Sequence, residues 1–236
     1  HEHRAIKMNT SRLPGIAAFN DDIRDALKGN NGNKKSKGFV SGLDLREEGV
    51  KFGVAGAIRH PQIVYDYVET TKEPWAAEPD QCINYVSCHD NYTLWDKLRF
   101  SCPRASDAEM RKMVKLAGAV ILTSQGVPFL HSGVEFCRTK KGHGNSYKAP
   151  DAVNQIDWSR KKKYADVVEY YKKLIHLRLQ HPAFRMTTAD LIRKNLHFCT
   201  QYKLGVVSYC IEGKASGDSW EKIILIFNGN RKEIGR

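Results

Sequence analysis

Apolar side chains recur at helical spacing in two long stretches of this chain. The first stretch begins after Ser106 and Glu109, which are three residues apart as in a capping box, and continues to Leu122. Its apolar positions are Met110, Met113, Val114, Ala117, Val120 and Ile121. The second stretch covers residues 164–178 and has to end before Pro182, because proline disfavours helical backbone in the residue that precedes it. The pattern therefore predicts two amphipathic helices.

Short apolar runs alternate with helical segments over most of the chain. Residues 13–19, 83–87 and 127–130 predict three short strands, and the first of these is expected to be buried. Asn20 is suited to cap a short helix after the first strand, and Gly29 is suited to end it. Alternating strands and helices are typical of a parallel sheet with helical crossovers, so the pattern predicts an α/β fold.

The last part of the chain has a different pattern. Residues 206–211 and 223–227 are β-type runs separated by a polar turn, and they predict a small antiparallel unit of two strands. This change of pattern predicts two domains, at residues 1–190 and 191–236.

Three other segments lack a clear period. Residues 30–42 are rich in Gly, Asn, Ser and Lys and predict an exposed loop. Residues 43–80 are expected to be irregular because prolines interrupt them, and residues 138–158 form a polar loop.

Composition narrows the possible classes of protein. The 236 residues contain 38 Lys and Arg against 26 Asp and Glu, a formal charge of +12, with 41% hydrophobic residues. The basic residues stand in short clusters separated by acidic ones, which favours solvated faces over a nucleic-acid partner. No run approaches the ~18 apolar residues of a membrane span. The six cysteines include no C-x-x-C pair, so neither a zinc site nor a disulfide scaffold is predicted, and buried thiols are expected.

Polar residues directly follow the second predicted strand, in the order Cys88-His89-Asp90-Asn91. The carboxyl ends of parallel strands carry site residues in α/β barrels. A carboxylate there is suited to hold sugar hydroxyls or to stabilise a cationic transition state, and the adjacent imidazole can donate a hydrogen bond to a neutral substrate. The alternative is structural, with His89 and Asp90 pairing with backbone and capping a helix over residues 93–98.

Two further groups of polar residues have both a chemical and a structural interpretation. Asn20, Asp21, Asp22 and Arg24 resemble acid–base machinery, but helix capping and an Asp21–Arg24 pair at i, i+3 are favoured. The loop over residues 138–158 offers amides, hydroxyls and aromatic rings, which suit carbohydrate. Its polar and aromatic positions are Arg138, Asn145, Ser146, Tyr147, Asp151, Asn154, Gln155 and Trp158.

Taken together, these segments resemble one family closely over residues 7–185. The matching stretches are Asn9-Thr10-Ser11-Arg12-Leu13-Pro14-Gly15-Ile16, Phe19-Asn20-Asp21-Asp22-Ile23-Arg24-Asp25-Ala26, Ile83-Asn84-Tyr85-Val86-Ser87-Cys88-His89-Asp90-Asn91, Thr93-Leu94-Trp95-Asp96-Lys97, Ser124-Gln125-Gly126-Val127-Pro128-Phe129, Arg138-Thr139-Lys140, Asn145-Ser146-Tyr147, Ala149-Pro150-Asp151 and Asn154-Gln155-Ile156-Asp157-Trp158. In this order they resemble the type I pullulanases, debranching enzymes of glycoside hydrolase family 13 in the α-amylase superfamily.

The resemblance implies a TIM-type (β/α)8 barrel followed by a β-sandwich. It also implies retaining hydrolysis of α-1,6-glucosidic branch links in pullulan, amylopectin, glycogen or limit dextrins, with an α-glucan as the partner. By this resemblance Asp90 is the transition-state stabiliser and His89 binds a sugar hydroxyl. The other positions that match the substrate cleft are Asn91, Arg138, Asn145, Asp151 and Asn154. No cofactor or metal is predicted, and calcium is not indicated.

The chain also departs from the family's pattern. The nucleophile stretch Gly-x-Arg-x-Asp and the acid stretch Gly-Glu-Gly-Trp of the family are absent from the 236 residues. We therefore expect a partial barrel, about strands six to eight, followed by the beginning of a β-sandwich, with the other barrel half upstream. Hydrolysis by this chain alone is not expected. The alternatives are a non-catalytic glucan-binding relative or an inactive fragment, and, with less support, a basic nucleic-acid binder.

Overall fold

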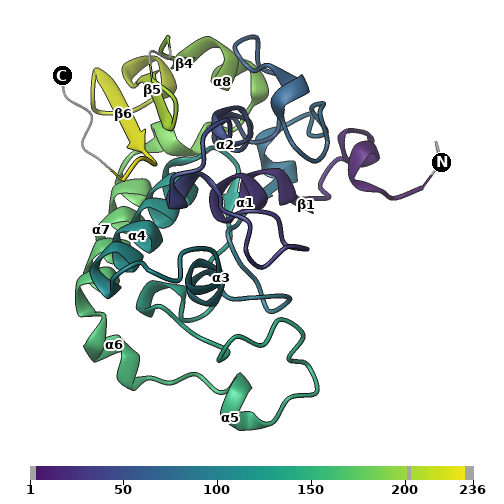
Figure 1. Ribbon diagram of the computed structural model, residues 1–236. Helices are drawn as coiled ribbons and strands as arrows, with labels where there is room; N and C mark the ends of the chain where they lie inside the picture. The colour runs from purple at the N-terminus through teal and green to yellow at the C-terminus, as the bar shows by residue number, and fades with distance from the viewer. Residues whose placement is uncertain (1–3, 201–202, 232–236) are drawn as a thin grey trace.

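The computed structural model describes residues 4–200 and 203–231. Helices surround one small parallel sheet, and an antiparallel sheet packs at one end of the molecule (Figure 1). The α-helices are α1 (Asp21–Lys28), α2 (Glu47–Val54), α3 (Leu94–Ser101), α4 (Asp107–Thr123), α5 (Asp151–Asn154), α6 (Ser159–Lys163), α7 (Ala165–Gln180) and α8 (Ala189–Asn195). Short 3-10 helices lie at Lys7–Arg12, Phe39–Ser41, Tyr65–Tyr67, Pro79–Gln81, Val134–Phe136, Pro182–Arg185 and Lys214–Ser216.

The parallel sheet consists of β1 (Ala18–Phe19), β2 (Cys82–Asn84) and β3 (Val127–Pro128), in the order β1-β2-β3. Both strand pairs are parallel, with Ala18 opposite Cys82 and Ile83 opposite Val127. The helices α1 and α2 lie between β1 and β2 in the sequence, and α3 and α4 lie between β2 and β3. The predicted α/β alternation with helical crossovers is therefore confirmed.

The residues predicted to begin and end helices do so in the structure. The Asn20 side chain accepts hydrogen bonds from the backbone N–H groups of Asp22 and Ile23 at the start of α1, and Gly29 follows its last residue. Ser106 and Glu109 complete both bonds of the capping box at the start of α4. The helix α7 ends at Gln180, two residues before Pro182.

The antiparallel sheet has one strand more than predicted. Its strands are β4 (Leu196–Phe198), β5 (Val206–Glu212) and β6 (Lys222–Asn228), with β5 in the centre. Only β5 and β6 contain the long β-type runs from which the sequence predicts strands. The three residues of β4 are too few to show a period, and the strand forms because Leu196 and Phe198 pair with Ile211 and Tyr209 of β5.

Three local predictions were wrong. Residues 13–19 do not form a buried strand, because only Ala18 and Phe19 pair with β2 and the Phe19 side chain is 40% exposed. Residues 30–42 are not exposed throughout, since Phe39–Ser41 forms a buried 3-10 turn. The irregular region 43–80 contains the helix α2, whose inner face packs on α1.

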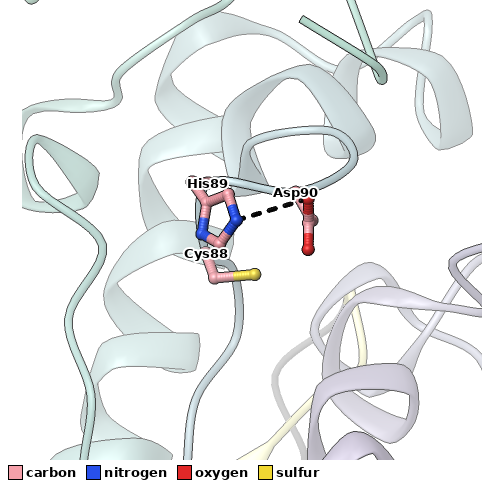
Figure 2. Close-up of side chains that lie close together, drawn as sticks. All are labelled: Cys88, His89 and Asp90. Atoms are coloured by element: carbon pink, nitrogen blue, oxygen red, sulfur yellow. Dashed lines mark ion pairs between the residues drawn. The ribbon is translucent and has the colours of Figure 1, made fainter. Parts of the chain in front are cut away.

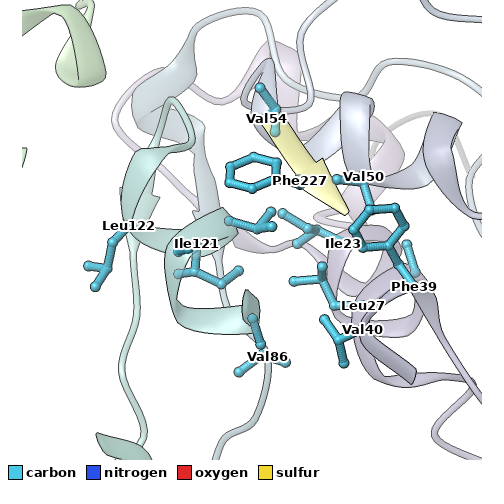
Figure 3. Packing of buried hydrophobic residues seen from close by; sticks show 14 of the residues in the cluster. Ile23, Leu27, Phe39, Val40, Val50, Val54, Val86, Ile121, Leu122 and Phe227 are labelled. Carbon is cyan, nitrogen blue, oxygen red and sulfur yellow. The ribbon is translucent and has the colours of Figure 1, made fainter. Parts of the chain in front are cut away.

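One hydrophobic cluster runs through the molecule and includes residues from both sheets. Figure 3 shows Ile23 and Leu27 of α1 close to Val50 of α2 and Phe227 of β6. At the parallel sheet, the buried Asn84 amide donates to the carbonyls of Gly53 and Gln125 at 2.8 and 2.9 Å. Among the described residues, no helix is long and apolar enough to cross a membrane.

Candidate functional site

The candidate site is the loop that leaves the carboxyl end of β2. The parallel strand ends at Asn84, and the chain then passes through Cys88, His89, Asp90 and Asn91 before α3 begins at Leu94. These polar residues lie there because burial ends at Ser87, and the residues that follow it are partly or fully exposed. This is the edge of a parallel sheet at which α/β barrels carry their site residues.

His89 and Asp90 point into solvent, and they contact each other. Their side chains are 87% and 70% exposed, and His89 Nε2 lies 3.4 Å from Asp90 Oδ1 (Figure 2). The predicted structural alternative is not what the structure shows, because Thr93 caps α3: its side chain accepts a hydrogen bond from the Asp96 N–H at 3.1 Å. The imidazole and the carboxylate are thus available to a ligand.

The backbone of this loop is held from beneath by buried charge. The Lys140 side chain, which is buried, donates from Nζ to the His89 carbonyl at 2.9 Å. Lys140 is itself fixed by its backbone N–H, which donates to Asp96 Oδ2 at 2.7 Å, and the Thr139 hydroxyl donates to Asp96 Oδ1. Burial lowers the pKa of Lys140, aided by the positive charge of Arg138. The loop position is therefore set by a network that includes Asp96, Thr139 and Lys140.

Two predicted substrate-binding residues make contacts within the polar loop. Arg138 donates from Nη2 to the Asn154 carbonyl at 2.8 Å and from Nη1 to the Ser132 carbonyl at 3.1 Å. Asn154 Nδ2 donates to the carbonyls of Ser146 and Ala149 at 2.7 and 3.0 Å. Through these contacts both side chains stabilise the folded-back conformation of residues 138–158.

The other predicted residues are exposed. Asn91 has φ +58°, a left-handed conformation that Asn tolerates better than most residues, and Asn145 and Asp151 face solvent. Among the described residues, no hydrogen bond or ion pair links the side chain of Asn91, Asn145 or Asp151 to Asp90. The polar loop does reach the candidate site nearby, since a Cβ on Gly144 would lie 3.1 Å from the Tyr92 ring.

Residues near the end of β1 confirm the structural interpretation of that segment. Arg24 pairs with Asp21 at i, i+3, and the Tyr85 hydroxyl donates to the same Asp21 carboxylate oxygen at 2.6 Å. Burial opposes ionisation of Asp21, but hydrogen bonds from Lys7 and Tyr85 and the charge of Arg24 outweigh it, so the pKa of Asp21 is lowered.

Two buried lysines beside the site were missed in the sequence. Lys28 approaches the Tyr92 carbonyl at 3.5 Å, and burial together with the charge of Arg24 lowers its pKa to about 7. Lys97 donates to the Asn30 carbonyl at 3.0 Å and to Ser36 Oγ at 2.9 Å, and burial lowers its pKa to about 8. Their positions in the sequence are the one signal of their burial, because both lysines lie on helix faces that also carry apolar core residues.

The expectation of buried thiols is confirmed for half of the cysteines. All six are free; Cys82, Cys102 and Cys137 are buried, Cys88 and Cys210 are partly exposed, and Cys199 is exposed. The thiol of Cys88 therefore belongs to the accessible surface of the candidate site.

The chain is similar to known proteins in sequence and in structure. The chain is 41% identical over 234 residues to the pullulanase of Bacillus subtilis (strain 168), covering 99% of this chain and 31% of that protein. It superposes on the crystal structure of apo pullulanase from Paenibacillus barengoltzii with a TM-score of 0.89 and 48% identity, covering 96% of this chain and 33% of that one. The chain is a homologue of the type I pullulanases.

Further matches agree with this pullulanase homology. A family model described as "Pullulanase, all-beta domain" matches residues 192–235, which include β4, β5 and β6. A crystal structure of the Paenibacillus barengoltzii pullulanase in complex with maltohexaose and α-cyclodextrin matches with a TM-score of 0.88 and 48% identity, over 96% of this chain and 34% of that one. The chain spans about a third of the length of these relatives.

Proposed function

We propose that this chain forms part of a retaining glycoside hydrolase that cleaves α-1,6-glucosidic branch links in glucans such as pullulan and limit dextrins. The observation that carries the proposal is the exposed carboxylate of Asp90 at the carboxyl end of β2, in a pullulanase homologue. An oxocarbenium-like transition state gains positive charge on the sugar, and a carboxylate that approaches it stabilises that state more than the ground state.

The sheet supports a partial barrel as the framework of this site. The strand order β1-β2-β3 follows the sequence, with a helical crossover between each pair, as in a (β/α)8 barrel. The outer strands carry exposed apolar side chains, with Phe19 on β1 and Val127 on β3. We propose that these strands correspond to barrel strands six to eight, and that strands from a segment outside these 236 residues complete the barrel and supply the nucleophile and the acid.

His89 is assigned a binding role for the glucan in this proposal. Its imidazole is exposed beside Asp90, and its backbone carbonyl is fixed by Lys140, so it can present a ring nitrogen to a sugar hydroxyl. Asn91, Asn145 and Asp151 are exposed and remain proposed contacts to the glucan. Arg138 and Asn154 remain in the proposed set, with the added task of folding residues 138–158.

The test is a chimaera in which this chain replaces the matching segment of the Bacillus subtilis pullulanase. We expect the chimaera to hydrolyse pullulan, and the 236 residues alone to release no reducing sugar from it. Asp90→Asn in the chimaera should lower kcat by orders of magnitude and leave maltooligosaccharide binding largely intact, because the carboxylate acts mainly in the transition state. Steady-state kinetics and calorimetric binding measure the two effects.

An exposed aspartate elsewhere provides the matched control. Asp190→Asn, at the start of α8, should leave kcat of the chimaera within about twofold, because its side chain is 91% exposed and lies outside the site. Near-normal kcat in Asp90→Asn would remove Asp90 from the catalytic set. A folded chimaera that binds glucan but hydrolyses none would favour a non-catalytic glucan-binding relative.

A further inference from the structure

Three different metal-binding groups meet in the loop after β2. The Cys88 thiol, the His89 imidazole and an Asp90 carboxylate oxygen all lie within 4.8 Å of one another. Figure 2 shows the imidazole next to both the thiol and the carboxylate. Within the part of the chain that the structure describes, three or more His, Cys, Asp or Glu side chains bring their ligand atoms this close together only here.

These side chains are not used to hold the fold. His89 and Asp90 contact each other at 3.4 Å, and Cys88 is a free, partly exposed thiol. Lys140 fixes the loop through its backbone, because its Nζ donates to the His89 carbonyl. This contact does not involve the imidazole nitrogens of His89. The three donor groups are therefore free to rotate toward a common point, on a loop whose backbone is anchored.

The donor set selects the class of metal. Calcium and magnesium take oxygen ligands, whereas zinc is bound by thiolate, imidazole and carboxylate together. Bonds of about 2.0–2.3 Å place tetrahedral ligands roughly 3.5 Å apart. The observed spacing of up to 4.8 Å thus has to shrink by about 1 Å. Rotation of exposed side chains can supply that movement without moving the backbone.

We propose that Cys88, His89 and Asp90 bind one zinc ion, with the fourth position open to water. The bond to sulfur forms as the thiol proton passes to solvent, so the ion is held by a thiolate, a neutral imidazole and a carboxylate. The sequence predicts no zinc site because its cysteines form no close pairs, whereas here the ligands are three different residue types. A zinc ion at this position occupies Asp90, so zinc inhibits hydrolysis; this consequence rests on the proposed function, whereas zinc binding itself does not.

The binding test uses the 236-residue chain, zinc salt alone and a chromogenic chelator as competitor. We expect one equivalent of zinc per chain, and an affinity at least tenfold lower in Cys88→Ser. The matched control is Cys199→Ser, which removes the exposed cysteine that follows β4 and should leave the affinity unchanged. Cobalt(II) gives a second readout, since its thiolate charge-transfer band should vanish in Cys88→Ser and persist in Cys199→Ser. Absence of stoichiometric zinc binding, or equal affinity in wild type and Cys88→Ser, overturns the proposal.

The chimaera separates this proposal from the proposed function. Zinc should lower pullulan hydrolysis in the chimaera, and Cys88→Ser should raise the zinc concentration for half-inhibition at least tenfold. Retained inhibition in Cys88→Ser would place the inhibitory zinc elsewhere and overturn the regulatory consequence. If the chimaera is folded but inactive while the chain still binds zinc through Cys88, the proposed function fails and the zinc site stands.

Discussion

Three buried lysines lie around the candidate site. Lys28, Lys97 and Lys140 are almost fully buried, and each ammonium group contacts backbone carbonyl oxygen: Tyr92, Asn30 and His89, respectively. Removing a charge from water costs free energy that hydrogen bonds only partly restore. In return, Lys140 and Lys28 fix the loop on the two sides of Asp90, and Lys97 fixes residues 30–36.

Lys28 makes the stability of the chain depend on pH. Its pKa is about 7 in the folded chain against 10.5 for an unperturbed lysine. Between these pH values the unfolded chain binds a proton that the folded chain lacks, so Lys28 makes stability rise with pH, and it adds no slope well below pH 7. Lys28→Met removes this buried charge. The variant should be more stable than wild type at pH 6.5, and its advantage should shrink by about 3 kcal/mol by pH 9.5.

Urea unfolding at the two pH values measures this effect. Lys35→Met, a substitution in the exposed loop, serves as the control and should shift stability equally at both pH values. An advantage of Lys28→Met that is the same at pH 6.5 and 9.5 would show that Lys28 keeps an ordinary pKa in the folded chain.

The sequence identified the exposed residues of the site better than the supporting ones. His89 and Asp90 come a few residues after the apolar strand β2, so local pattern predicts their position beyond its carboxyl end. The bond from Lys140 to the His89 carbonyl joins positions 51 residues apart, and no local pattern signals it. The same holds for Arg138, whose guanidinium contacts depend on how residues 138–158 fold back.

At the scale of elements, the two longest helices approach each other through a glycine. A Cβ on Gly118 of α4 would lie 2.4 Å from Cζ of Tyr171 on α7. Tyr171 is buried, and its hydroxyl donates to the Val114 carbonyl at 3.2 Å, so the ring has little freedom to move. The glycine allows the helices to pack closely, although glycine disfavours a helix by about 1 kcal/mol relative to alanine.

Gly118→Ala sets these two effects against each other. The gain in helix propensity is at most about 1 kcal/mol, whereas overpacking a core typically costs about 1–3 kcal/mol. We expect net destabilisation of about 1–2 kcal/mol, seen as a lower urea midpoint. In a Tyr171→Leu background, which makes room for the methyl group, the same change should cost less. A higher midpoint for Gly118→Ala alone would contradict the close packing of α4 and α7.

The sequence predicts an element well when the signals for that element lie within its own residues. The helix α4 has a capping box, α7 stops before Pro182, and both have a long apolar period, so both are predicted almost to the residue. The helix α2 was missed because Gly49 and Gly53 weaken its helical pattern. Those glycines are required by packing, since a Cβ on Gly53 would overlap the Ile23 side chain of α1. Such a requirement is visible only after α1 and α2 have been brought together.

At the scale of the whole molecule, the antiparallel sheet and the α/β part share one core. Val207, Tyr209 and Phe227 of the sheet belong to the same hydrophobic cluster as the helices. Polar contacts also join the antiparallel sheet to the α/β part. The Tyr209 hydroxyl donates to the Thr123 carbonyl at 3.2 Å, and His60 Nε2 lies 3.1 Å from the Leu196 carbonyl. The cluster thus extends across the domain boundary predicted at residue 190.

This shared core makes a prediction about truncation. A chain that ends at residue 190 lacks the sheet side chains that pack on α2 and at the end of α4, and it exposes the apolar surface that they cover. Because the shared core is then incomplete, the shortened chain should unfold without a cooperative transition and should bind a hydrophobic dye. The full chain should unfold in one step by calorimetry and by tryptophan fluorescence. A sharp transition in the shortened chain would show instead that residues 1–190 form a core of their own, and that the antiparallel sheet only rests on it.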